Sequence, residues 1–150
     1  MIVGVLGFSG AGKTCYLRAH LYPPLQASGA SFYVLPANPD GEGQWIMREK
    51  DRQNTRDARR FTERFVDWVI DSAPTLAEQF EVVYLDCGGL ISRENERILS
   101  ICDEAIIVSR NSEEFAEWEQ FVSTCKAMAI TQIRSSASLD GELTFRKIGG

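Results

Sequence analysis

The sequence has no long apolar run, no basic tail and only one histidine. Its apolar stretches fall short of the roughly 18 residues that cross a bilayer, so no membrane-spanning helix is expected. The formal net charge is −5, without a lysine cluster, and broad nucleic-acid binding, which needs many Lys and Arg against phosphates, is not expected. Residues 1–6 are apolar but lack a basic leader and a cleavage site, so they predict a strand rather than a signal peptide.

The four cysteines include no Cys-x-x-Cys pair. Cys15, Cys87, Cys102 and Cys125 are scattered along the chain, and His20 is the single histidine. Such a set offers no plausible zinc site. We therefore interpret the cysteines as reduced thiols, mostly in the core, of a cytoplasmic protein.

What the chain does contain is typical of one globular domain. It has 150 residues, of which 44% are hydrophobic and 25% charged, a length sufficient to close one core. No repeat, linker or low-complexity stretch divides it, so 1–150 is expected to form a single domain.

Predicted strands alternate with predicted helices. The strands are expected at 1–6, 31–35, 80–85, 105–108 and 128–133, with a further candidate at 143–147. Helices are expected from Lys13 to just before Pro23, at 55–71, at 92–102 and from Asn111 onward. This alternation predicts an α/β fold in three layers, the P-loop NTPase fold, with a mostly parallel central sheet of five or six strands.

Local signals support these helices. Phe61, Phe65, Trp68 and Val69 recur at i, i+4, i+7 and i+8 and form one apolar stripe. Ser92 is a suitable N-cap. Asn111, followed three residues later by Glu114, resembles a capping box.

The strongest motif is Gly-Phe-Ser-Gly-Ala-Gly-Lys-Thr at 7–14, which matches the P-loop pattern Gly-x-x-x-x-Gly-Lys-Ser/Thr. Its glycines let the backbone approach phosphate oxygens, and the following helix presents its positive end to them. Lys13 is expected at the β- and γ-phosphates and the Thr14 hydroxyl on Mg²⁺. The predicted nucleotide contacts are Gly7, Ser9, Gly10, Ala11, Gly12, Lys13, Thr14 and Cys15.

Asp86, after the apolar run 82–85, is the candidate second acid for the metal's outer shell. No glutamate follows it, so the hydrolytic base of many ATP-driven motors is missing. The spacing Asp86-x-x-Gly89 instead resembles GTPases and kinase-like P-loop proteins, in which the glycine amide senses the γ-phosphate. Residues 108–112 do not supply the Asn-Lys-x-Asp guanine signature, so ATP is favoured over GTP.

A second constellation lies in the loop 37–45, which combines two acids, two glycines and a tryptophan. Asp40 or Glu42 could act as a general base or add a metal contact. A turn without a chemical role is equally well supported, because Asn-Pro and Asp-Gly are strong turn signals. The candidate catalytic residues are therefore Lys13, Asp40 and Glu42.

The loop 38–45, together with 86–95 and 105–109, is similar to the P-loop ATPase-like domain fused to CRISPR-associated ring nucleases of type III systems. The similarity covers about 1–135. It implies a nucleotide site at Gly12, Lys13, Thr14 and Asp86, roles for Asp40, Glu42 and Trp45, and a ring-nuclease protein or domain as partner. Because 150 residues leave no room for the half that degrades cyclic oligoadenylates, nuclease activity itself is not implied.

Three functions follow as hypotheses. The first is an ATP- and Mg²⁺-binding, slowly hydrolysing regulatory domain, with Arg48, Arg93 and Arg110 as candidates for charge compensation. The second is a small-molecule or nucleoside kinase that uses Asp40 as base, and the third is a GTPase-like switch. The oligomeric state stays open, a homo-oligomer included.

Overall fold

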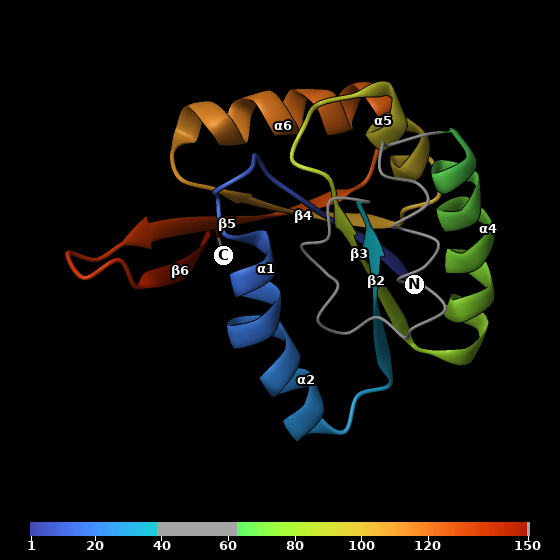
Figure 1. Ribbon diagram of the computed structural model, residues 1–150, viewed down its shortest axis with the longest axis horizontal. Coiled ribbons are helices and arrows are strands. Elements are labelled where there is room, and N and C mark those ends of the chain that lie inside the picture. Colours follow the sequence, from blue (N-terminus) through green and yellow to red (C-terminus); the bar gives the residue numbers. More distant parts are fainter. Residues whose placement is uncertain (39–62, 150) are drawn as a thin grey trace.

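A computed structural model describes residues 1–38 and 63–149 (Figure 1). Its strands are β1 (Ile2–Leu6), β2 (Phe32–Ala37), β3 (Val82–Cys87), β4 (Glu104–Ser109), β5 (Ala129–Ala137) and β6 (Leu143–Ile148). Its helices are α1 (Lys13–Tyr16), the π-helical turn η1 (Leu17–Leu21), α2 (Tyr22–Ser28), α4 (Glu63–Gln79), α5 (Arg93–Leu99) and α6 (Ser112–Cys125).

The strands form one sheet in the order β2-β3-β1-β4-β5-β6. All neighbours are parallel except β5 and β6, which pair antiparallel. The central strand β1 is buried along its whole length, as expected for an apolar strand covered on both faces. Because β1, β3 and β4 are parallel neighbours, the segments that follow them meet at one edge of the sheet.

Alternate side chains of the strands enter two separate cores. One core, which includes Leu6, Leu85 and Ile107, packs against α4, α5 and α6. The other, which includes Val5 and Ile106, packs against the helical segment from α1 to α2. Figure 1 shows these two helical layers on opposite sides of the sheet. The predicted three-layer α/β architecture with a mostly parallel sheet is therefore confirmed.

The helix after the P-loop does not end before its two prolines, contrary to the prediction. Helical backbone continues through η1 into α2, whose first turn contains Pro23 and Pro24. The first turn of a helix has amides without intrahelical partners, so proline is tolerated there. The change of register is made in η1, where the amide of Tyr22 donates to the carbonyl of Leu17, five residues earlier.

Helix α4 also differs from its predicted range of 55–71. Residues 55–62 lie outside the described residues, and the helix continues past Pro74 to Gln79. The added turns are held by packing, because Ala73 is fully buried and Leu76 and Ala77 contact the same core. Tertiary packing thus outweighs the helix-breaking tendency of one proline.

Both predicted helix caps are confirmed. The Ser92 hydroxyl accepts a hydrogen bond from the amide of Asn95 at 3.2 Å and begins α5. Asn111 Oδ1 accepts one from the amide of Glu114 at 2.9 Å and begins α6. Helix α5 is shorter than expected, since it ends at Leu99 rather than at Cys102.

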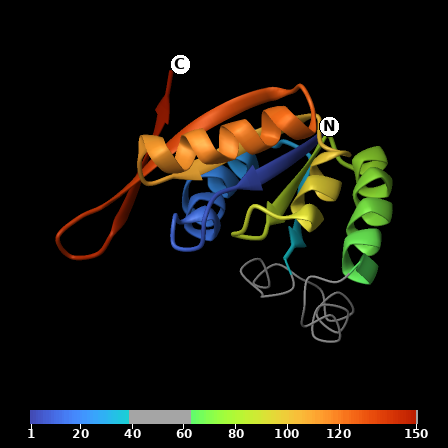
Figure 2. The same ribbon diagram turned by 90° about the horizontal axis from the view of Figure 1, so that it is seen from above.

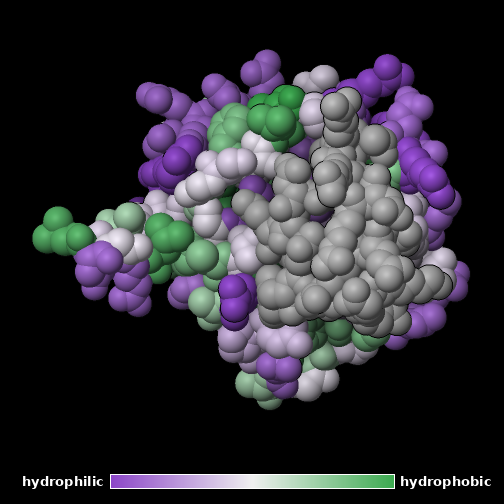
Figure 3. Space-filling model, in the orientation of Figure 1, coloured by the Kyte–Doolittle hydropathy of each residue, from purple (hydrophilic) through white to green (hydrophobic). Residues whose placement is uncertain are grey.

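The β5–β6 hairpin projects from the body of the molecule in both ribbon views (Figures 1 and 2). Leu139, near its tip, is fully exposed, and the same projection carries hydrophobic surface in Figure 3. At its base, Phe145 packs against Tyr16 and His20, with ring centroids 5.6 and 4.8 Å apart.

Within the described ranges, no helix has the length and apolar character to cross a membrane.

Candidate functional site: a phosphate-binding loop

The P-loop connects β1 to α1 at the edge where the central strands end. Gly10 and Gly12 have φ of +86° and +98°, in the left-handed region that side chains disfavour. Gly7 is constrained further, because a Cβ there would lie 2.3 Å from the carbonyl oxygen of Val108. The amide of Ala11 donates to the Phe8 carbonyl at 3.0 Å and closes the loop. The glycines are thus required by backbone conformation and by close approach to β4.

Lys13 begins α1, yet its side chain is only 2% exposed. Its ammonium donates to the carbonyl oxygen of Gly7 at 2.8 Å. The long side chain therefore folds back over the loop and places a positive charge beside its backbone. A buried ammonium is costly unless anions or carbonyls compensate it, so this position suits a group that meets phosphate oxygens.

Asp86 lies beside Thr14 although 72 residues separate them. The Thr14 hydroxyl donates to Asp86 Oδ2 at 3.5 Å, and Asp86 is only 1% exposed. Asp86 belongs to β3 itself, which runs two residues past its predicted end, and it is in register with Val5 of β1. The sheet therefore brings together the two residues that were predicted to hold the metal.

This donor set fits Mg²⁺ held jointly with a nucleotide. Mg²⁺ commonly takes one or two protein oxygens, with phosphate oxygens and water completing its octahedron. In residues 1–38 and 63–149, no group of three or more His, Cys, Asp or Glu side chains could hold a metal alone. Thr14 and Asp86 offer a hydroxyl and a carboxylate at one point, which is the chemistry that a phosphate-bound Mg²⁺ needs.

The turn after β3 presses against the P-loop. A Cβ on Gly89 would lie 2.4 Å from Ser9 Oγ and 2.7 Å from Ser9 N. Distances this short allow only glycine at this position unless one backbone moves. The predicted contacts Ser9 and Gly89 are therefore adjacent, and the turn forms a second wall beside the loop.

Of the three arginines considered from the sequence, Arg110 lies near the loop. A Cβ on Gly10 would be 3.4 Å from Arg110 Nη1. Arg110 Nε donates to Glu114 Oε2 at 3.0 Å, and this hydrogen bond lowers the pKa of Glu114. Arg93 lines a groove on α5, and Arg48 lies outside the described residues.

The four cysteines, predicted to lie mostly in the core, differ in exposure. Cys87 and Cys102 are buried, Cys125 is partly buried and Cys15 is exposed. Burial raises the pKa of Cys102 to about 12 and that of Cys87 well above its ordinary value. Cys15, in α1 directly after Thr14, is the accessible thiol beside the P-loop.

The structure thus brings the predicted contacts at 7–15 together with Asp86 and Gly89. The candidate catalytic residues Asp40 and Glu42, like Trp45, lie outside the described residues. Sequence reasoning gave no role to Asn95. This residue is fully buried and donates to two carbonyls of the turn that contains Gly89. No motif identifies it, since its role depends on how α5 folds back on that turn.

No protein-family model matches the chain, and a search of curated proteins found no match. Solved structures do share its fold. Cobyrinic acid a,c-diamide synthase from Mycobacterium smegmatis, with bound ADP and magnesium, has a TM-score of 0.69 at 10% identity, over 93% of this chain and 76% of that one. A putative plasmid partition protein from Borrelia burgdorferi bound to AMPPNP has a TM-score of 0.61 at 11% identity, over 87% and 73%.

Apo McdA from Cyanthece is similar as well, with a TM-score of 0.63 at 12% identity over 96% of this chain and 76% of that one. At such low identity these likenesses concern the fold alone. Together with the sheet order and the loop geometry, they show that this chain has the three-layer α/β fold of P-loop NTPases.

Proposed function

We propose that this chain binds a nucleoside triphosphate with Mg²⁺, with ATP preferred, and acts as a slow ATPase or a nucleotide-dependent regulator. One observation carries the proposal. The buried ammonium of Lys13 and the Thr14–Asp86 pair lie beside a glycine loop in which Gly10 and Gly12 have positive φ, a backbone that supports close approach of amides to phosphate oxygens. The site combines the backbone amides at the start of α1, the Lys13 ammonium and the side-chain oxygens of Thr14 and Asp86. Together these groups are suited to bind a polyphosphate with its metal ion.

Each residue then has a distinct role. The amides of the loop and of the first turn of α1 hold the phosphates, and Lys13 neutralises charge on the β- and γ-phosphates. Thr14 and Asp86 hold the ion, which neutralises phosphate charge when bound. Arg110, beside Gly10, could add a further positive charge. Asp40 and Glu42 remain the candidates for orienting the attacking water.

Adenine is favoured over guanine because the guanine signature is missing at 108–112. The similar structures from Mycobacterium smegmatis and Borrelia burgdorferi carry ADP and AMPPNP respectively. Those ligands belong to those proteins, and they support the choice of adenine nucleotides for the first experiments on this chain.

Thermal unfolding with ligand tests the proposal. A ligand present at 100 times its Kd stabilises the folded state by about 2.7 kcal/mol, a shift of several degrees for a domain of this size. We expect Mg²⁺-ATP to raise the unfolding temperature of the wild type, GTP to raise it less, and Lys13→Ala to abolish the shift. No shift with either nucleotide, or an equal shift in Lys13→Ala, would overturn the proposal.

Product analysis then separates hydrolysis from phosphoryl transfer. Inorganic phosphate released from ATP in the absence of an acceptor supports the ATPase. Phosphate release only with an added acceptor, which itself becomes phosphorylated, supports the kinase.

The link to type III CRISPR signalling is a finer proposal that rests on the similarity of 38–45 and 86–95. The first of these segments lies almost entirely outside the described residues, and the matched structures named above include no ring nuclease. Co-purification with a type III ring nuclease from the same genome, and an ATP-dependent change in its cyclic-oligoadenylate cleavage, would support this link. Absence of both effects would remove it and leave nucleotide binding intact.

A further inference from the structure

We infer that Asn95 is a positioning residue that holds the Gly88–Leu90 turn against the P-loop and thereby sets the preference for a triphosphate over a diphosphate. The inference rests on the proposed function, since it concerns the same nucleotide site. It concerns a residue that belongs to no nucleotide-binding motif.

The side-chain amide of Asn95 clamps the turn from inside. Nδ2 donates to the carbonyl of Gly88 at 3.0 Å and to the carbonyl of Leu90 at 2.8 Å. Both neighbours are acceptors, so the amide nitrogen and not the oxygen must face them. Gly89 lies between the two clamped carbonyls, and it is the residue whose backbone contacts Ser9.

The Asn95 side chain is fully buried, and only one end of its amide is hydrogen-bonded in the described part of the chain. Asn95 is 0% exposed, and within the described residues its Oδ1 has no hydrogen-bond partner. An unsatisfied buried acceptor is destabilising, and the two hydrogen bonds from Nδ2 offset that cost by satisfying the carbonyls of Gly88 and Leu90. Asn95 therefore stabilises one conformation of the turn, which an apolar side chain of the same shape would not do.

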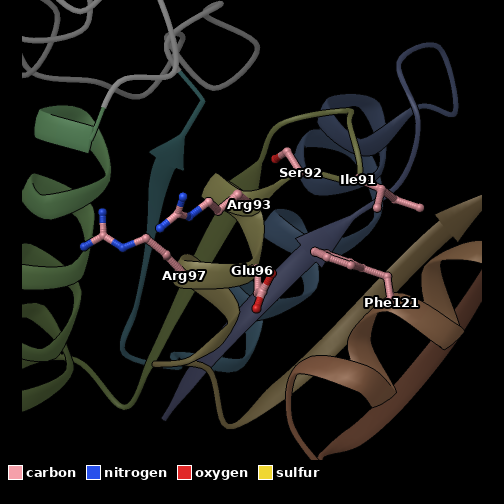
Figure 4. Close-up of a pocket in the computed structure, with 6 residues that line it drawn as sticks. All are labelled: Ile91, Ser92, Arg93, Glu96, Arg97 and Phe121. Atoms are coloured by element: carbon pink, nitrogen blue, oxygen red, sulfur yellow. The ribbon is translucent and has the colours of Figure 1, made fainter.

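The side chains of the turn provide little alternative anchorage. Leu90 is 71% exposed and Ile91 41% exposed, and Figure 3 shows hydrophobic surface above the sheet edge near the turn. Behind it, a shallow groove of about 630 Å³ is lined by Ile91, Ser92, Arg93, Glu96, Arg97 and Phe121. In Figure 4, Arg93 and Arg97 point toward α4, Ile91 and Phe121 lie on the α6 side, and Glu96 lies between them.

Because Gly89 lies against Ser9 of the P-loop, we expect the turn to interact with the phosphate end of a bound nucleotide. Lys13 serves the β- and γ-phosphates, and the turn borders the same loop. A turn held at that distance can donate its amides to the terminal phosphate, a contact that a diphosphate lacks. A turn that is held less firmly should bind a triphosphate more weakly and leave the affinity for a diphosphate unchanged.

The test is isothermal titration of the full chain with Mg²⁺-AMPPNP and with Mg²⁺-ADP. Asn95→Leu keeps the branched shape of the side chain and removes the amide donor that makes both hydrogen bonds. We expect this variant to bind AMPPNP about tenfold more weakly or worse, which is the contribution of one hydrogen bond to a charged group. The affinity for ADP should change less than about twofold. Asn95→Ala serves as a second variant with the same expected result if Asn95→Leu does not fold.

A matched control separates positioning from general destabilisation. Val66→Ala removes buried volume from α4 and lowers thermal stability without removing a hydrogen bond of the turn, so the ratio of AMPPNP to ADP affinity should stay at the wild-type value. If Asn95 variants lower both affinities equally, or keep the wild-type ratio, the inference is wrong while the nucleotide site stands. If the wild type binds neither ligand, the proposed function itself fails.

Discussion

Replacing Gly7 by alanine tests the geometry of the loop quantitatively. Gly7 has φ of +152°, and a Cβ there would lie 2.3 Å from the Val108 carbonyl oxygen, where ordinary contact begins at 3.4 Å. Val108 belongs to a central strand and cannot rotate away, so the loop must move by about 1 Å relative to β4. Because the Gly7 carbonyl accepts a hydrogen bond from Lys13, the same movement shifts the Lys13 ammonium.

Two contributions set the expected loss of stability for Gly7→Ala. Holding alanine in a glycine-only backbone region costs about 1–3 kcal/mol, and overpacking adds about 1–3 kcal/mol. We therefore expect the free energy of unfolding, measured by urea denaturation without nucleotide, to fall by about 2–6 kcal/mol. Binding of Mg²⁺-AMPPNP should weaken at least about tenfold, because a displacement of about 1 Å is large for positioned groups.

Gly29→Ala is the matched control for Gly7→Ala. Gly29 also has positive φ, +73°, at the end of α2, but a Cβ there would meet nothing within 4 Å. It should cost only about 1 kcal/mol and leave AMPPNP binding unchanged. If both variants lose the same stability and both bind AMPPNP normally, the close approach of the loop to β4 has no consequence and the reasoning is refuted.

Three further predictions use the same site and its surroundings. Asp86→Asn should abolish the Mg²⁺ dependence of AMPPNP affinity, measured by titration with and without the ion, and a retained dependence would place the metal elsewhere. Maleimide should label Cys15 before the buried thiols of Cys87 and Cys102, and AMPPNP should slow that labelling; mass spectrometry that finds a buried thiol labelled first would contradict this. Because the hydrogen bond from Arg110 lowers the pKa of Glu114 below its ordinary 4.5, the pair stabilises the fold above that pH and loses its effect as the pH falls through the lowered pKa. Glu114→Gln should therefore lower the urea midpoint slightly at pH 7 and reduce the dependence of that midpoint on pH below pH 4.5. An unchanged pH dependence would argue against the pair.

Local chemistry made much of this site predictable. The spacing of the P-loop glycines, Lys13 and Thr14 is short-range, and an acid ending an apolar strand identified Asp86. Ser92 and Asn111 were recognised as caps because capping needs only a side chain and an amide three residues on. The two caps are confirmed because they depend on local contacts alone, whereas the role of the P-loop residues and of Asp86 in nucleotide binding stays a prediction.

Features set by tertiary contacts were not predictable. The continuation through Pro23 and Pro24 depends on a π-helical turn, and the extension of α4 past Pro74 depends on burial against the sheet. The clamp made by Asn95 depends on α5 folding back on a turn five to seven residues earlier. The hydrophobic pattern of the sequence does not predict such contacts.

A crystal structure of the chain with Mg²⁺-AMPPNP tests the central claim most directly. The account predicts phosphate oxygens within hydrogen-bond distance of Lys13 Nζ and of the loop amides, the ion beside Thr14 and Asp86, and the terminal phosphate next to Gly89. A nucleotide bound elsewhere, or a P-loop that stays empty at saturating AMPPNP, would contradict it.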